Sequence, residues 1–166
     1  MKALSIWQPW ASLIAVGAKR FETRSWPTRY RGPIAIHAAR HWGQECADVF
    51  SWYAVQADLA PMVGIDPPLL KRDLPFGAIV AVAVLADCVP TQKLRTEILG
   101  NRMLGNFAPG RFAWRLERVE RLLRPIPCTG RQGLWEPGVF GNRMVTLEQY
   151  VGELRGEGLL VKEGWA

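Results

Sequence analysis

The chain has 166 residues, of which 49% are hydrophobic and 22% are charged. This length and balance fit one compact globular domain and exclude a disordered chain. The net charge of +6 is confined to the first quarter of the chain, because residues 1–40 hold seven Lys or Arg and one acid, whereas residues 41–166 hold 14 of each sign. Such asymmetry is typical of a surface that meets a polyanion, and a solvated basic face that serves only solubility is the alternative.

The cysteine and histidine content argues against a metal or a cofactor. Cys46, Cys88 and Cys128 form no CxxC pair, and His37 and His41 do not form an HExxH arrangement. We therefore expect no disulfide framework, no metal ion and no cofactor.

No segment predicts a membrane anchor. Gln8-Pro9 interrupts the apolar start of the chain, which would otherwise resemble a signal peptide. The nine apolar residues 78–86 are too few to span a bilayer. We expect a cytoplasmic protein with no membrane partner.

Three short strands and one helix are predicted in the N-terminal quarter. A strand over 2–8 is followed by a helix that starts at Pro9, because proline is favoured in a first helical turn. Gly17 stands where a glycine in the left-handed conformation ends such a helix. Alternating residues then predict strands over 20–26 and 33–39, separated by a loop.

Beyond residue 40 the pattern becomes mixed. A helical segment over 41–60 and a proline-rich connector precede a buried strand over 78–86, and residues 92–106 fit a weak helix or a loop. The C-terminal part contributes an amphipathic strand, a short edge strand and a helix, over 112–117, 125–135 and 146–154. Five or six short strands with two or three helices predict an α+β fold, a small mixed β-barrel with helices packed on it.

The densest chemistry lies where the first helix turns into the second strand. Lys19 follows the helix-ending Gly17, and strand alternation puts Glu22 and Arg24 on one face and Thr23 on the other. A partly desolvated lysine beside a carboxylate can transfer protons, because burial lowers the lysine pKa. The same side chains can instead hold a base edge or a phosphate, or close the turn as a structural ion pair. The spacing leaves these three interpretations open.

The GxKxxExR element formed by Gly17, Lys19, Glu22 and Arg24 resembles the ASCH domain family, which is related in fold to PUA domains. The stretches WQPWA, RSWPT, RGPIAIHAA, GAIVAVAVLADC and QGLW extend the resemblance over most of the chain. It implies a single ASCH domain over residues 1–166 with a PUA-like β-barrel, and we expect 41–75 to be a helical insertion. It further implies a cleft floored by the motif that binds RNA, another nucleic acid or a modified nucleoside.

The resemblance also implies a second function class. Some members are amidohydrolases of acylated cytidine and others are reported as ribonucleases, and in the amidohydrolase branch a threonine three residues after the motif lysine is the nucleophile. Glu22 occupies that place here. The alternative hypothesis is therefore a metal-independent hydrolase of an N4-acetylcytidine-type nucleoside or of RNA, with Lys19 as base and Glu22 or Asp87 moving the proton. A module that binds a protein partner is a third alternative.

The predicted nucleic-acid-binding residues are mostly basic or aromatic and lie in the first forty positions. They are Lys19, Glu22, Arg24, Trp26, Arg29, Arg31, His37 and Arg40. Trp26 is the candidate for stacking on a base, whereas Trp7, Trp10 and Trp114 are expected in the core. His37 also fits a hydrogen-bonded barrel histidine, and Asp87 also fits a turn before Pro90.

Overall fold

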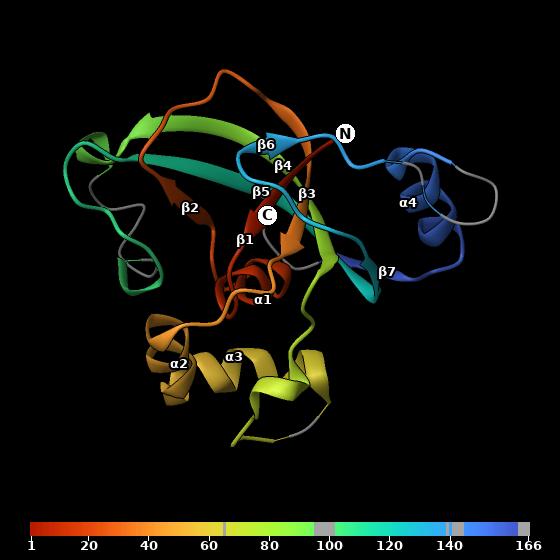
Figure 1. The fold of residues 1–166 in the computed structure, drawn as a ribbon, viewed down its shortest axis with the longest axis horizontal. Helices are drawn as coiled ribbons and strands as arrows, with labels where there is room; N and C mark the ends of the chain where they lie inside the picture. The colour runs from red at the N-terminus through yellow and green to blue at the C-terminus, as the bar shows by residue number, and fades with distance from the viewer. Residues whose placement is uncertain (65, 95–101, 139, 141–144, 163–166) are drawn as a thin grey trace.

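The computed structural model describes residues 1–64, 66–94, 102–138, 140 and 145–162. In this part of the chain, strands form one mixed sheet in the order β2-β5-β4-β3-β1-β6, and β7 also pairs with β5. The sheet curls into a half-barrel (Figure 1). The strands are β1 (Lys2–Ile6), β2 (Phe21–Arg24), β3 (Gly32–Ala38), β4 (Ala78–Pro90), β5 (Phe112–Pro127), β6 (Leu134–Trp135) and β7 (Leu160–Lys162). The predicted small mixed β-barrel is thus confirmed as a half-barrel, and the prediction missed β7.

The two longest strands of the sheet, β4 and β5, form an antiparallel pair. Register shifts between Ile79 and Ala81 and at two further places bend the pair, as extra residues in a ladder do. Both strands run past their predicted ends. The polar end of β4 pairs with the start of β5, and the later part of β5 pairs with the first half of β4. Pro125 and Pro127 belong to β5, so the predicted edge strand over 125–135 is wrong in its first half. The edge strand that exists there is β6.

Helix α1 (Trp10–Ala15) lies inside the curl of the sheet, where its apolar side chains join the core around Ile36 and Trp114 (Figure 1). Gly17 has a φ of 80°, and its N–H donates to the Ile14 carbonyl at 2.9 Å. The predicted glycine stop of this helix is therefore confirmed. It makes the chain turn back sharply into β2, which sets the place of Lys19.

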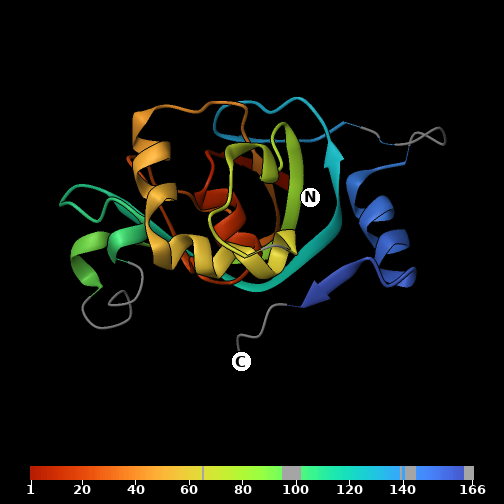
Figure 2. The ribbon, with the colours of Figure 1, turned by 90° about the horizontal axis from the view of Figure 1, so that it is seen from below.

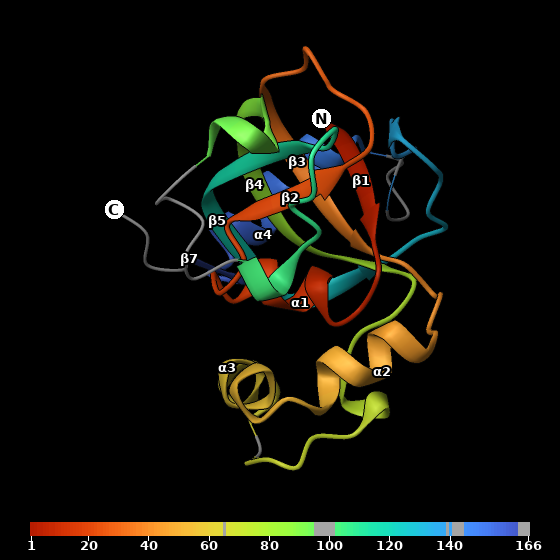
Figure 3. The ribbon, with the colours of Figure 1, turned by 90° about the vertical axis from the view of Figure 1, so that its left-hand side faces the viewer.

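The other helices cover two sides of the half-barrel (Figures 2 and 3). The predicted helix over 41–60 is two helices, α2 (Gln44–Ser51) and α3 (Tyr53–Val63), because the backbone of Trp52 between them is extended. They form a separate apolar cluster with Leu13 of α1.

Helix α4 (Leu147–Gly156) packs on the outer face of the sheet, against side chains such as Val82 and Leu122. Its N-cap is Thr146, as predicted, and Gln149 completes a capping box. No helix among the described residues is long and apolar enough to cross a membrane.

Candidate nucleic-acid interface

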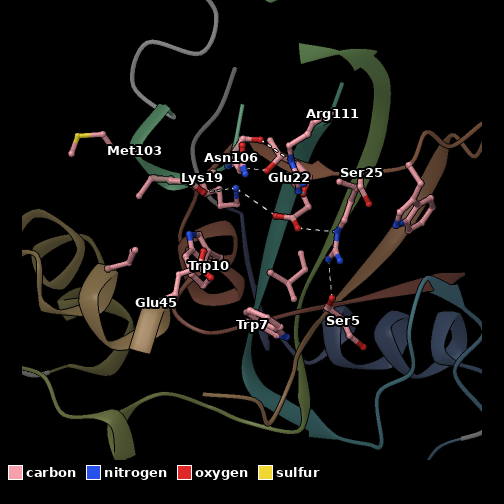
Figure 4. Close-up of a pocket in the computed structure, with 17 residues that line it drawn as sticks. Ser5, Trp7, Trp10, Lys19, Glu22, Ser25, Glu45, Met103, Asn106 and Arg111 are labelled. Atoms are coloured by element: carbon pink, nitrogen blue, oxygen red, sulfur yellow. Dashed lines mark hydrogen bonds and ion pairs between the residues drawn. The ribbon is translucent and has the colours of Figure 1, made fainter. Parts of the chain in front are cut away.

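Two neighbouring cavities are lined by residues of β1, β2 and β3. The first, of about 480 Å³, is lined by Lys19 and Glu22, and we call it the Lys19 cavity (Figure 4). The second, of about 620 Å³, is lined by His37, Arg40 and Arg131, and we call it the Arg40 cavity. Ser5, Trp7, Arg24 and Trp26 line both. The two cavities therefore lie next to each other, and we call them together the groove.

Lys19 stands at the inner end of the groove and is 1% exposed. Its Nζ donates to the carbonyls of Phe21 at 2.5 Å and Leu104 at 2.7 Å, and lies 3.4 Å from Glu22 Oε2. Burial lowers the pKa of Lys19, Glu22 opposes this shift, and Arg24 adds slightly to it. Three acceptors surround the three hydrogens of an ammonium group, so Lys19 ties the turn before β2 to the short helical turn Arg102–Leu104.

Glu22 also pairs with Arg24, so that three charged side chains lie in a row along the groove. Arg24 Nε lies 3.0 Å from Glu22 Oε1, and Arg24 Nη2 donates to the Ser5 carbonyl at 2.9 Å. The predicted placement of Glu22 and Arg24 on one face is therefore confirmed. The remaining guanidinium N–H groups of Arg24 meet no acceptor among the described residues, and its side chain is 24% exposed. Arg24 thus offers hydrogen-bond donors at the wall that the two cavities share.

Thr23 differs from its predicted place. It lines the Lys19 cavity, and its Oγ1 accepts a hydrogen bond from the Asn106 N–H at 3.1 Å. The reason is that residues 102–107 fold over β2, so that a Cβ on Gly105 would lie 3.2 Å from both Lys19 Nζ and Thr23 Oγ1. Residues 92–106 carried no pattern that predicted this contact.

The burial of the tryptophans differs in part from the prediction. Trp114 is fully buried, as expected, and Trp26 is half-buried with its ring edge-on to Trp114 at 4.6 Å. Trp7, which was expected in the core, is 43% exposed and lies against the ring of His41. The reason is that Gln8 takes the inward position after β1, where its side chain donates to Ser12 Oγ and the Pro75 carbonyl. The groove therefore has an exposed aromatic wall. Trp10, also expected in the core, is half-buried and lines the Lys19 cavity.

The outer end of the groove surrounds His37, which is 2% exposed. Its Nε2 lies 3.1 Å from the Cys128 carbonyl, whereas Nδ1 has no partner among the described residues. Burial lowers the pKa of His37, nearby Arg40 adds to the shift, and the Cys128 carbonyl opposes it. The ring of Trp135 meets it edge-on, so His37 is held as a barrel histidine at the floor of the cavity.

Three predicted site residues lie outside the groove. Arg31 pairs with Asp87 at 2.9 Å and also donates to the carbonyls of Thr28 and Tyr30. A hydrogen bond from the Cys88 N–H, with help from Arg31, lowers the pKa of Asp87. Asp87 lines a different cavity, and Arg29 is exposed in the loop before β3. The structure thus does not bring Asp87 to Lys19.

The groove also contains polar residues that sequence reasoning did not single out. Asn106 and Arg111 line the Lys19 cavity, and Arg131 and Gln132 line the Arg40 cavity. All four belong to loops, where no periodicity indicates which way a side chain points. Among the described residues, no group of three or more His, Cys, Asp or Glu could hold a metal ion.

The curled mixed sheet with α1 inside it is the PUA-like fold of ASCH proteins. The crystal structure of ASCH from Zymomonas mobilis matches with a TM-score of 0.54 and 16% identity, over 92% of this chain and 94% of that one. Residues 4–107 match the ASCH domain, and the chain belongs to the ASCH domain family.

Among curated proteins, Activating signal cointegrator 1 of Homo sapiens and that of Mus musculus are each 27% identical to this chain over 135 residues. This alignment covers 80% of this chain and 22% of each relative. The chain therefore corresponds to less than a quarter of the length of those proteins.

Proposed function

We propose that this protein binds single-stranded RNA in the groove, with one base in the Lys19 cavity against Trp7 and Trp26. The observation that carries the proposal is the exposure of Trp7 on a wall shared with Arg24. A large exposed aromatic side chain next to unengaged guanidinium N–H groups fits the stacking and hydrogen bonding that hold unpaired bases.

The Lys19 cavity suits one base in size and chemistry. Its volume of about 480 Å³ lies in the range of ligand sites, about 300–1,000 Å³. Arg24 supplies donors to a base edge, and the Asn106 side chain, whose Oδ1 accepts from the Ala108 N–H, keeps its NH₂ group for a ligand. Lys19 and Glu22 hold this edge in place, because their charged atoms are engaged with one another, the backbone and Arg24.

The basic residues of the groove supply the long-range attraction. Arg24 and Arg111 line the inner cavity, and Arg40 and Arg131 line the outer one. Binding that displaces counterions from RNA weakens as salt rises. We therefore expect the affinity to fall with a negative slope of log K against log salt.

The test is the fluorescence anisotropy of a labelled single-stranded RNA of about ten nucleotides, a length within the range of known single-strand sites. Loss of one stacking partner costs about 1–3 kcal/mol, so Trp7→Ala should weaken binding by about 5- to 150-fold. Trp52→Ala is the matched control, because Trp52 is 37% exposed and lines neither cavity. Equal affinities of Trp7→Ala and the unmodified protein, or no RNA binding at low salt, would contradict the proposal.

One observation favours hydrolysis as a second candidate. The Thr23 hydroxyl and the Lys19 Nζ both lie beside Gly105, and burial lowers the pKa of Lys19. In its neutral form Lys19 would take the Thr23 proton while the Thr23 oxygen bonds to the acetyl carbon; the bond from that carbon to the cytosine nitrogen would break as the nitrogen takes up the proton. Water would then release acetate from Thr23. Chromatography of N4-acetylcytidine incubated with the protein tests this chemistry. Turnover that Thr23→Val abolishes and Asp87→Asn leaves unchanged supports it, and no turnover removes it.

A further inference from the structure

The Arg40 cavity has a charge pattern unlike that of the Lys19 cavity. Arg24, Arg40 and Arg131 line it, and its lining contains no carboxylate. Arg40 and Arg131 are both exposed, and neither has an ion-pair partner among the described residues. Arg24 is paired with Glu22, whereas Arg40 and Arg131 line the cavity without a counter-charge from the described residues. Such like charges repel one another, and an anion in the cavity relieves this repulsion.

Two glycines shape the cavity. At Gly77, where φ is 63°, a Cβ would lie 2.6 Å from Arg40 Nε, so the Arg40 side chain rests directly on this backbone. At Gly130, a Cβ would lie 2.5 Å from His37 Nδ1 and 2.7 Å from Ser5 Oγ. The backbone at Gly130 therefore lies close to the floor of the cavity, and the exposed Arg40 side chain packs on Gly77.

The floor contains an independent sign of a missing partner. His37 Nδ1 is buried and has no hydrogen-bond partner among the described residues, although buried polar atoms are almost always paired. Because His37 Nε2 donates to the Cys128 carbonyl, Nδ1 of the neutral ring is an acceptor, so the anion site rests on the cations Arg40 and Arg131.

We propose that the Arg40 cavity is a phosphate-binding subsite, which takes one phosphate of the RNA strand whose base lies in the Lys19 cavity. This inference rests on the proposed function and names the group that occupies the second half of the groove. Arginine suits the role, because its planar fork binds phosphate oxygens in pairs. The shared wall of Trp7 and Arg24 makes the subsite adjacent to the base, as a neighbouring phosphate requires.

The first test compares two double variants in the RNA anisotropy assay, each measured over a range of salt concentrations. Arg40→Gln with Arg131→Gln removes the unpaired charges of the subsite. Arg118→Gln with Arg124→Gln is the matched control, because both residues are exposed on β5 and line neither cavity. The subsite variant should bind at least about tenfold more weakly at low salt, and its salt slope should fall by about 0.7 for one lost phosphate contact. The control should lose less in both measurements.

The second test uses inorganic phosphate with the full chain, observed through the backbone amide signals of ¹⁵N-labelled protein. Shifts at Gly130 and Arg131 that disappear in the subsite variant support the phosphate site, even if RNA itself does not bind and the proposed function fails. RNA binding of the subsite variant that equals that of the control, together with no phosphate-dependent shift at Gly130, overturns the inference. If Trp7→Ala weakens RNA binding and the subsite variant does not, the proposed base cavity is supported and the phosphate subsite is rejected.

Discussion

The two cavities of the groove share a wall and differ in how their charges are neutralised. In the Lys19 cavity, Lys19, Glu22 and Arg24 each meet an opposite charge, and Lys19 and Arg24 also donate to carbonyls. In the Arg40 cavity, Arg40 and Arg131 have no opposite charge in the described part of the chain. Charges paired within the fold hold the shape of the Lys19 cavity, whereas Arg40 and Arg131 are the charges that the proposed ligand would neutralise.

The largest effect on stability is expected from removing Lys19, the buried end of the row of ion pairs that it forms with Glu22 and Arg24. Lys19→Met leaves Glu22 without one of its cations and two carbonyls without a donor, and removal of one member of a buried pair costs about 3–5 kcal/mol. Urea unfolding measures this loss in the free energy of unfolding. Lys2→Met is the control, because Lys2 forms an exposed pair with Glu136 at 3.4 Å and such pairs contribute about 0–1 kcal/mol. A loss below about 1 kcal/mol for Lys19→Met would show that the inner cavity is not built on its charges.

A smaller effect is expected at the floor of the outer cavity. Gly130→Ala places a methyl group 2.3 Å from His37 Cε1, so the loop must move, and overpacking of this kind costs about 1–3 kcal/mol. The phosphate-dependent amide shifts should weaken together with stability. Gly138→Ala is the matched control, since a Cβ there meets nothing within 4 Å, and it should change neither quantity. If the two alanine variants have equal stability and equal phosphate-dependent shifts, the close packing of Gly130 on His37 is not needed for the subsite.

The smallest effect concerns pH and tests whether His37 is buried in its neutral form. Because burial lowers the pKa of His37, the unfolded chain binds a proton near its ordinary value of 6.5 while the folded chain still does not. Stability present above that pH is therefore lost as the pH falls through 6.5 toward the lowered value. Urea unfolding at a series of pH values should show a shallower decline for His37→Asn than for the unmodified protein. Parallel declines would exclude a depressed pKa at this position.

The inner half of the site was predictable from the sequence because it is local. Gly17, Lys19, Glu22 and Arg24 lie on one helix, turn and strand, so the glycine stop and the strand alternation place their backbones and faces. The alternation could not show that Thr23 also lines the Lys19 cavity, because its neighbour Asn106 comes from a segment far along the chain. Local rules predict which way a side chain leaves its strand, and distant loops decide what it meets.

The exposed aromatic wall and the outer cavity were less predictable. A hydrophobic pattern cannot show that Gln8 turns inward and leaves Trp7 in solvent, because that choice depends on a hydrogen bond to the distant Pro75 carbonyl. Arg131 lies in a loop without periodicity, and Asp87 was assigned to the cleft from its position at a strand end. The strand in fact continues to Pro90, so Asp87 pairs with Arg31 on another side of the molecule. Strand ends are set by pairing over the whole sheet.

Whether RNA occupies this groove can be read from the tryptophan indole N–H signals of ¹⁵N-labelled protein during titration with single-stranded RNA. The signals of Trp7 and Trp26, which line both cavities, should shift in proportion to bound RNA. Trp42 and Trp52 line neither cavity, and their signals should remain unchanged. Shifts confined to Trp42 and Trp52, or RNA binding that leaves Trp7 and Trp26 unmoved, would contradict the proposal that RNA binds in the groove.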